Sequence, residues 1–288
     1  MKSESGLITK QDEFDAAMAK DIKLMNSSLN SLNDLGVAPI GELTTITGPK
    51  GNGKSAFVKT ILTEACTQNV KTLIILSEEK ILQYKMPIAE VIRRVTDKDT
   101  ANNKLSHLTF TTMIDYKKNE LNIESIITYL TEMIKVKNIE FIIFDNFTTS
   151  FFGQQSPEKQ AIAISKFRKL ASDNNIGLLI VFHTIKGANP YERLLDGEDV
   201  RGNATSTNTA ACNYVLTTFF KCSPPRAFLH IDKARYNSKL NKTYWELNFH
   251  NETGIYVEDI KVPSNLIEGL MKYLKQQAKD MVVTNNFK

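Results

Sequence analysis

Eight consecutive residues, Gly48 to Ser55, match the spacing G-x-x-x-x-G-K-[ST] at every fixed position. Glycines in such a segment let the backbone curl so that successive N–H groups point at phosphate oxygens. Lys54 would then reach the β- and γ-phosphates of ATP, and the Ser55 hydroxyl would hold Mg²⁺. The alternative is a chance glycine-rich turn, but an apolar run precedes the segment and a helical pattern follows it, as the motif requires. The residues expected to line this phosphate site are Gly48, Pro49, Lys50, Gly51, Asn52, Gly53, Lys54, Ser55 and Ala56.

Acidic residues follow two other apolar runs. Asp145 comes directly after Ile142-Ile143-Phe144, at the carboxyl end of an expected buried strand. Ligands bind at this end of the strands in open α/β sheets, so we expect Asp145 to help hold the metal ion rather than only to cap a turn. Glu78 and Glu79 follow a second apolar run. Either glutamate can orient or deprotonate water, and the alternative is a solvated acidic pair that opens a helix.

These side chains need a sheet whose strand ends converge. The apolar runs expected as strands are residues 43–47, 72–76, 108–110, 140–144, 177–182, 214–220, 227–232 and 243–249. Amphipathic periodicity predicts helices at residues 54–68, 81–97, 123–136, 157–172 and 264–283. Nearly continuous apolar strands separated by helices are typical of a sheet that is covered on both faces. The expected fold class is therefore α/β, with a mostly parallel sheet flanked by helices on both faces.

The two ends of the chain differ from the middle. Residues 1–30 form a polar arm with one predicted amphipathic helix, whose apolar face consists of Phe14, Ala17, Met18, Ile22 and Met25. This helix either packs on its own domain or docks on a neighbouring subunit. We therefore expect an N-terminal arm at 1–30, a core domain at 31–262, and a C-terminal helix with a tail at 263–288.

Composition excludes several classes of protein. Hydrophobic residues make up 42% of the 288 residues and charged residues 24%, as in an ordinary globular protein. No apolar run approaches the roughly 18 residues of a transmembrane helix, and the polar first residues are not a secretory signal. Cys66, Cys212 and Cys222 lack a C-x-x-C spacing, which argues against a disulfide framework or a cysteine zinc module and favours a reducing, cytoplasmic compartment. The net charge of +4 permits an anionic partner without requiring one.

Taken in order, the motifs resemble the RecA-type motor domain of the DnaB-like and phage replicative ring helicases over residues 27–260. The lead-in Leu32-Asn33-Asp34-Leu35-Gly36 and Gly41-Glu42-Leu43-Thr44 is common across RecA-like ATPases. Ser77-Glu78-Glu79-Lys80 occupies the place of a Ser-Leu-Glu-Met-like segment whose glutamate is catalytic in that family. The resemblance therefore implies a RecA-like core, a metal role for Asp145, and Glu79 rather than Glu78 as the catalytic glutamate.

Three later segments extend the resemblance. His183 ends an apolar run where the family has a residue that couples nucleotide state to DNA, although a buried, satisfied histidine is the alternative. Asp199-Val200-Arg201-Gly202 matches an Asp-x-Arg-Gly segment of the family. Lys233-Ala234-Arg235-Tyr236 matches a Lys-x-Arg-aromatic segment whose arginine reaches the γ-phosphate held by the next subunit. Arg235, with Lys233, is thus implied to complete a neighbour's ATP site, and the alternative is a basic pair on a solvated strand face.

Two loops are candidates for contact with nucleic acid, residues 148–155 and 186–201. The second loop contains three cations that would attract backbone phosphates, Lys186, Arg193 and Arg201. Its acidic residues dilute this charge, so composition alone also fits a solvated surface loop. The resemblance implies single-stranded DNA as the partner, a homo-oligomer in the form of a hexameric ring, and other replication proteins in a bacterial or phage-infected cell.

Three classes of function follow from these observations. The leading interpretation is an ATP-driven helicase that translocates on single-stranded DNA. The second is a recombinase-type, ATP-switched protein or loader that binds single-stranded DNA, because Pro49 and Lys50 also suit recombinases. The third, a P-loop kinase for a small molecule, is disfavoured by the long chain after His183. Asn213 stands where the family usually has an aspartate, and no primase domain is recognisable, so ATP hydrolysis is a firmer expectation than unwinding by this chain alone.

Overall fold

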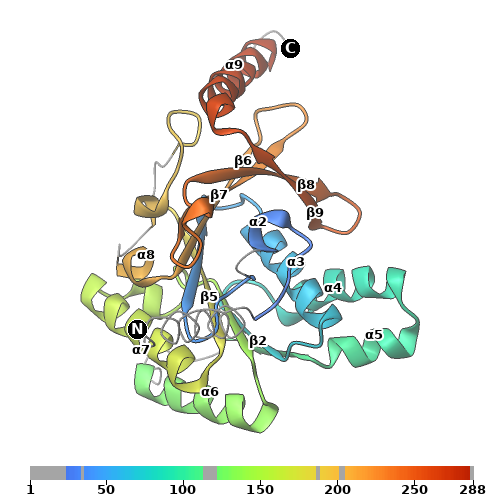
Figure 1. Cartoon of the computed structure of the whole chain (residues 1–288), viewed down its shortest axis with the longest axis vertical. Coiled ribbons are helices and arrows are strands. Elements are labelled where there is room, and N and C mark those ends of the chain that lie inside the picture. The colour runs from blue at the N-terminus through green and yellow to red at the C-terminus, as the bar shows by residue number, and fades with distance from the viewer. Residues whose placement is uncertain (1–23, 34–35, 113–121, 186–188, 201–204, 286–288) are drawn as a thin grey trace, which may run out of the picture.

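Nine strands form a single sheet in the part of the chain that the structure describes (Figure 1). The structure is a computed structural model that describes residues 24–33, 36–112, 122–185, 189–200 and 205–285. Neighbouring strands follow the order β3-β2-β4-β5-β1-β6-β7-β8-β9. The strands are β1 (Leu43–Gly48), β2 (Thr72–Leu76), β3 (Leu108–Thr112), β4 (Phe141–Asp145), β5 (Gly177–His183), β6 (Cys212–Phe219), β7 (Arg226–Ala234), β8 (Thr243–His250) and β9 (Ile255–Val262).

Strands β1 to β6 run parallel, and β7, β8 and β9 continue the sheet in antiparallel fashion. The register aligns Gly48 at the end of β1 with His183 at the end of β5. It also aligns Leu76 at the end of β2 with Asp145 at the end of β4. The expectation of a mostly parallel sheet is confirmed, and four of its strands end at one edge.

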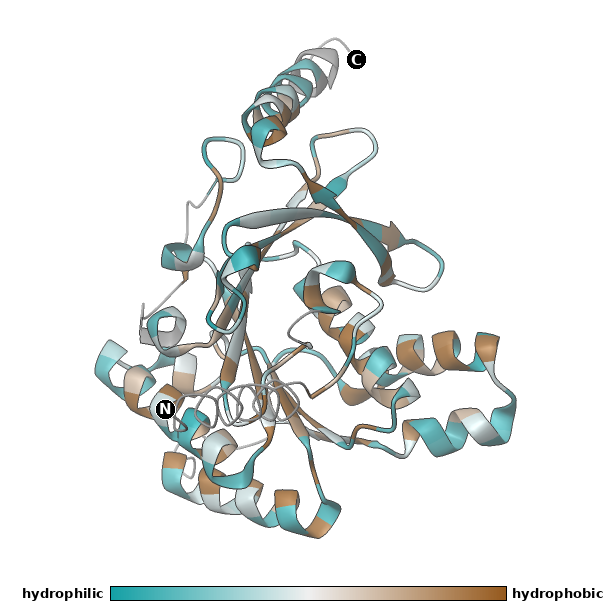
Figure 2. Ribbon diagram, in the orientation of Figure 1, coloured by the Kyte–Doolittle hydropathy of each residue, from teal (hydrophilic) through white to brown (hydrophobic). Residues whose placement is uncertain are grey.

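Helices cover both faces of the parallel part of the sheet, as expected. Alternate strand residues such as Ile46, Ile74 and Val181 pack with α3, α4 and α5 on one face. Ile142 and Ile180 pack with α6 and α7 on the other face, and hydrophobic residues accordingly colour the strands and the inner faces of the helices in Figure 2. The α-helices are α2 (Asn30–Asn33), α3 (Lys54–Thr67), α4 (Ile81–Val95), α5 (Lys98–Leu105), α6 (Ile123–Lys137), α7 (Pro157–Asn174), α8 (Thr205–Thr209) and α9 (Ile267–Asn285).

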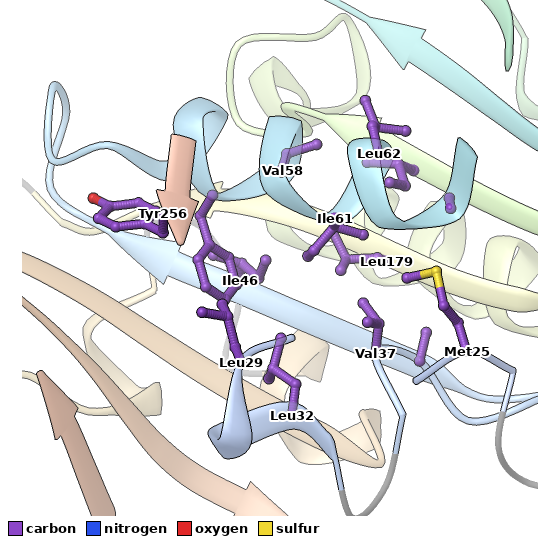
Figure 3. Close-up of a cluster of buried hydrophobic side chains, with 14 of the residues drawn as sticks. Met25, Leu29, Leu32, Val37, Ile46, Val58, Ile61, Leu62, Leu179 and Tyr256 are labelled. Carbon is purple, nitrogen blue, oxygen red and sulfur yellow. The ribbon is translucent and has the colours of Figure 1, made fainter. Parts of the chain in front are cut away.

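The core beside the glycine loop is closed by residues that precede β1. Val58 and Ile61 of α3 and Ile46 of β1 are fully buried together with Leu29 and Leu32 (Figure 3). Burial of each such side chain contributes about 1.5–3 kcal/mol, so this cluster fixes the start of α3 firmly on β1. The same cluster includes Met25, the last apolar residue of the repeat that predicts an arm helix. The rest of that predicted helix lies outside the described residues.

Two elements were not expected from the sequence. The helix expected over residues 81–97 ends at Val95, because the Asp97 side chain accepts hydrogen bonds from the backbone N–H groups of Asp99 and Thr100 and starts α5. Strand β9 pairs antiparallel with β8. Its charged residues mask the alternation that would have predicted a strand, and one of them, Asp259, is buried.

The final helix, expected from residue 264, begins at Ile267 after one turn of 3₁₀ helix. It extends away from the sheet in Figure 1. Its inner residues Leu270, Met271 and Leu274 pack against Phe219 and Phe228 of the antiparallel strands. No helix among the described residues combines the length and the apolar character needed to cross a bilayer.

Candidate active site

The glycine loop joins the end of β1 to the start of α3, as the motif predicts. Gly51 and Gly53 have φ values of 78° and 84°, a region that favours glycine. A Cβ atom on Gly48 would lie 2.2 Å from the backbone oxygen of Leu216 in β6. A Cβ atom on Gly53 would lie 2.5 Å from the hydroxyl oxygen of Tyr256 in β9. Glycine is therefore required both by the curl of the loop and by the strands packed against it.

Lys54 lies inside the curl of this loop and is only 5% exposed. Its Nζ donates hydrogen bonds to the backbone oxygens of Gly48, at 2.8 Å, and Pro49, at 2.7 Å. Burial lowers the pKa of Lys54 to about 8, while Asp145 and Glu78 act in the opposite direction. A bound phosphate would supply a full negative charge to this ammonium group, so the loop is prepared to hold an anion.

Asp145 ends β4 next to the start of α3 and is buried, with 5% of its surface exposed. Its carboxylate accepts hydrogen bonds from the hydroxyls of Ser55 and Tyr84. Burial raises the pKa of Asp145, and these two hydrogen bonds oppose the shift. Hydroxyl and carboxylate oxygens are ligands that Mg²⁺ prefers, usually in combination with substrate phosphates. The contact between Ser55 and Asp145 therefore fits a magnesium ion that would neutralise charge on a bound triphosphate.

Glu78 and Glu79, which follow β2, point at different partners. The Oε2 atom of Glu79 lies 3.0 Å from the Nζ atom of Lys59 in α3. The Oε1 atom of Glu78 lies 3.7 Å from the Nε2 atom of His183. Ser77 anchors the whole segment, because its Oγ exchanges hydrogen bonds with the backbone of Asn146. Both glutamates thus lie at the edge where the strands converge, and Lys59 ties the carboxylate of Glu79 to α3.

His183 lies at the end of β5, between the glycine loop and the acidic segment. Its Nε2 accepts a hydrogen bond from Nδ2 of Asn146 at 3.2 Å. Its buried Nδ1 has no hydrogen-bond partner within the described residues. Burial lowers the pKa of His183, and the nearby charge of Lys54 lowers it further. A neutral imidazole with one unpaired nitrogen, a short distance from Glu78, is suited to sense a change at the phosphate site.

Arg235 and Lys233 lie at the opposite end of the sheet from the glycine loop of the same chain. Arg235 follows β7, and its backbone N–H donates to the oxygen of Ala211, just before β6. Ala211 in turn donates to the oxygen of Leu43, the first residue of β1. Because β1 rises about 3.3 Å per residue, Leu43 and Gly48 lie roughly 17 Å apart. An arginine side chain is much shorter than this, so Arg235 does not reach its own phosphate loop.

The loop expected to contact nucleic acid is only partly covered by the described residues. Lys186 and Arg201 lie outside them. Arg193 is half exposed, and its guanidinium forms two hydrogen bonds with the carboxylate of Asp199, which is 1% exposed. The sequence did not predict this pair, which folds the loop back on itself. Contact of Arg193 with nucleic acid stays a prediction.

Several residues around the site were not predicted from the sequence. Tyr84 of α4 follows an ordinary apolar helix repeat, yet its hydroxyl reaches Asp145. Thr218 of β6 donates hydrogen bonds to the side-chain and backbone oxygens of Asn52 in the glycine loop. Tyr256 of β9 packs over Gly53, and its backbone N–H donates to Thr60 of α3. Only the late strands, which join the site through tertiary contacts, supply the last two residues, so no local signal could have identified them.

Comparisons with known proteins agree with this geometry. Residues 22–262 match the family model described as ATPase: KaiC. The fold is similar to the solved structure of the ATPase domain of a DnaB-like phage helicase, with a TM-score of 0.68 and 12% sequence identity over 88% of this chain and 98% of that chain. The expected RecA-like core, and the resemblance to DnaB-like motor domains, are confirmed at the level of the fold. The phosphate loop, the buried aspartate and the match over most of the sequence lead to one conclusion: the chain belongs to the KaiC family of ATPases.

Proposed function

We propose that this chain is an ATP-hydrolysing DNA motor of the ring-helicase type, which translocates on single-stranded DNA and has its ATP sites between subunits. The observation that carries this proposal is the position of Arg235. Arg235 lies at the sheet end opposite its own phosphate loop, with 36% of its side chain exposed. A cation placed there is available to a neighbouring molecule and not to the nucleotide of its own chain. A hexameric ring is one assembly in which every such arginine meets a phosphate loop.

Each residue of the site has a distinct role in this proposal. The backbone of residues 48–53 and Lys54 bind the β- and γ-phosphates, and Ser55 and Asp145 hold Mg²⁺, which stabilises the negative charge of the transferred phosphoryl group. Glu79 accepts a proton from the attacking water, and Lys59 holds its carboxylate in place. Arg235 of the neighbouring subunit stabilises charge that develops on the γ-phosphate. His183 reports the state of the γ-phosphate to the loop that follows β5.

The roles of the two glutamates can be separated by matched substitutions. Glu79→Gln is expected to lower kcat for ATP hydrolysis by about a hundredfold or more, because the base that takes the proton is lost. Glu78→Gln is expected to change kcat by only a few fold. Binding of a fluorescent ATP analogue should be retained by both variants, which shows that the phosphate loop is intact. The opposite ranking of kcat would assign the base to Glu78, beside His183.

The proposed shared site makes hydrolysis depend on assembly. The rate per mole of chain is expected to rise steeply with protein concentration, since only associated chains receive Arg235. Single-stranded DNA should stimulate the rate further, and blunt duplex DNA of the same length serves as the control. A rate per chain that is constant with concentration and indifferent to DNA would contradict the proposal. Displacement of a strand from a forked duplex then distinguishes a helicase from a recombinase-type binding protein.

A further inference from the structure

One carboxylate, Glu42, gathers three donors at the end of the sheet that carries Arg235. Glu42 immediately precedes β1, and its Oε1 accepts a hydrogen bond from Nη1 of Arg235 at 3.2 Å. The same oxygen accepts a hydrogen bond from the hydroxyl of Tyr236 at 2.8 Å. On the other side, Oε2 lies 3.5 Å from Nη2 of Arg168 in α7. Three elements that are distant in sequence therefore meet at a single anionic group.

The degree of burial distinguishes Glu42 from an ordinary surface ion pair. Its side chain is 16% exposed, whereas the side chains of Arg168 and Arg235 are 40% and 36% exposed. A carboxylate that is mostly removed from water is held in one place by its partners, and losing all of them would leave a costly unpaired charge. Arg168 and Tyr236 keep the carboxylate paired whether or not Arg235 is in contact with it. Glu42 is therefore a fixed point from which the Arg235 guanidinium is aimed.

The other side of the Arg235 guanidinium is held more loosely. Nη2 faces the backbone oxygens of Thr209 and Ala210 at 3.3 and 3.4 Å. The backbone N–H of Arg235 is fixed by the Ala211 oxygen at 2.8 Å. The backbone is therefore anchored, and the contact with Glu42 is the charge-assisted one that determines where the exposed head of the side chain points.

We propose that Glu42 is a positioning residue for ATP hydrolysis, which holds Arg235 in the orientation that a neighbouring subunit's γ-phosphate requires. This rests on the proposed function, in which Arg235 acts on the next subunit. Glu42 does not touch the nucleotide and acts only through Arg235. Loss of orientation lowers the rate of the chemical step, since a catalytic group must be held within a fraction of an ångström of its productive position. It leaves ATP binding by the neighbour's phosphate loop unchanged.

The first test is a kinetic one with a matched control. Glu42→Gln keeps the shape of the side chain and removes its charge, and is expected to lower kcat in the presence of single-stranded DNA by roughly tenfold or more, with KM for ATP within about twofold. Glu246→Gln is the control, because Glu246 forms an ion pair with Arg226 on the same sheet, far from Arg235 in sequence. Its kcat should not change. A kcat for Glu42→Gln that equals or exceeds that of the unchanged chain overturns the proposal.

A double substitution separates positioning from mere structural support. Arg235→Ala with Glu42→Gln is expected to be no slower than Arg235→Ala alone, because Glu42 has nothing left to position. Additive losses would overturn the proposal. Should Glu42→Gln lower the melting temperature, Tyr236→Phe removes another hydrogen bond to the same oxygen with less disturbance. It is expected to lower kcat by a smaller factor that also vanishes in the Arg235→Ala background, and an unchanged kcat would count against the proposal.

Mixed assemblies distinguish failure of this inference from failure of the proposed function. Chains with Glu42→Gln keep an intact phosphate loop, and chains with Lys54→Ala keep an intact Glu42 and Arg235. Mixing the two is therefore expected to restore hydrolysis above the sum of the separate rates. If mixing restores Arg235→Ala but not Glu42→Gln, Glu42 does not act through Arg235 and the inference fails alone. If neither variant is restored, the shared site itself is wrong.

Discussion

Lys54→Ala is expected to lower the rate of ATP hydrolysis on the order of a thousandfold or more. Lys54 is the cation inside the phosphate loop, with its Nζ 2.8 Å and 2.7 Å from two loop carbonyl oxygens. Removing it takes away the charge that binds the β- and γ-phosphates and that stabilises the transition state in a site shielded from water. The measurement is phosphate release at saturating Mg²⁺ and ATP. Affinity for ATP should fall in parallel, because the same ammonium group binds the ground state.

The control for this substitution is another lysine with similar contacts. Lys104 of α5 donates hydrogen bonds to the backbone oxygen of Thr67 and the side chain of Asn69, at the other end of α3. Lys104→Ala removes the same number of atoms from an exposed position and should leave hydrolysis nearly unchanged. Retained turnover by a folded Lys54→Ala chain would remove the assignment of residues 48–55 as the phosphate loop.

Arg235→Ala is expected to lower kcat by about a thousandfold with little change in nucleotide affinity. An arginine supplied by a neighbouring subunit contributes about 10³–10⁵ in rate, because it stabilises charge that appears only in the transition state. The nucleotide itself is bound by the loop of another chain, so a fluorescent ATP analogue should bind as before. Arg226→Ala is the matched control, since Arg226 lies at the other end of β7 and pairs with Glu246.

Mixing two inactive variants tests whether the site is shared. Arg235→Ala chains provide intact phosphate loops, and Lys54→Ala chains provide intact arginines. Some interfaces in the mixture then contain both, and turnover should reappear in proportion to their number. Turnover that stays absent at every mixing ratio, while size-exclusion chromatography shows that the two variants associate, would rule out action of Arg235 on a neighbour.

Local patterns were sufficient to predict the part of the site that one turn of chain creates. The spacing from Gly48 to Ser55 requires a strand, a glycine loop and a helix, and these are the elements observed. Asp145 was predicted because an aspartate at the end of a buried parallel strand must lie at the edge where other strands end. The side chains of Glu78 and His183 meet near the loop for the same reason. Here strand direction, which apolar runs reveal, fixes position.

Contacts made through side-chain reach across elements could not be predicted in this way. Tyr84 has the same spacing as core residues of α4, and only the three-dimensional packing brings its hydroxyl to Asp145. Strand β9 carries buried Asp259, whose carboxylate accepts hydrogen bonds from the backbone of Asn30 and Ser31. A charge that is neutralised by a segment 229 residues away leaves no local signature. Helix α5 was missed because Asp97 acts as a cap only in the folded geometry.

Strand β6 has a further mechanical consequence. Near its end, Thr218 is hydrogen-bonded to the phosphate loop through Asn52, and at its start, Cys212 pairs with Ala234, the neighbour of Arg235. One strand therefore joins the loop that grips a nucleotide to the arginine offered to a different nucleotide. Packed protein interiors resist compression and transmit displacement. In a closed assembly each chain would thus behave as a stiff connecting rod, so that a small movement at one nucleotide is felt at the next without any large change of shape within a subunit.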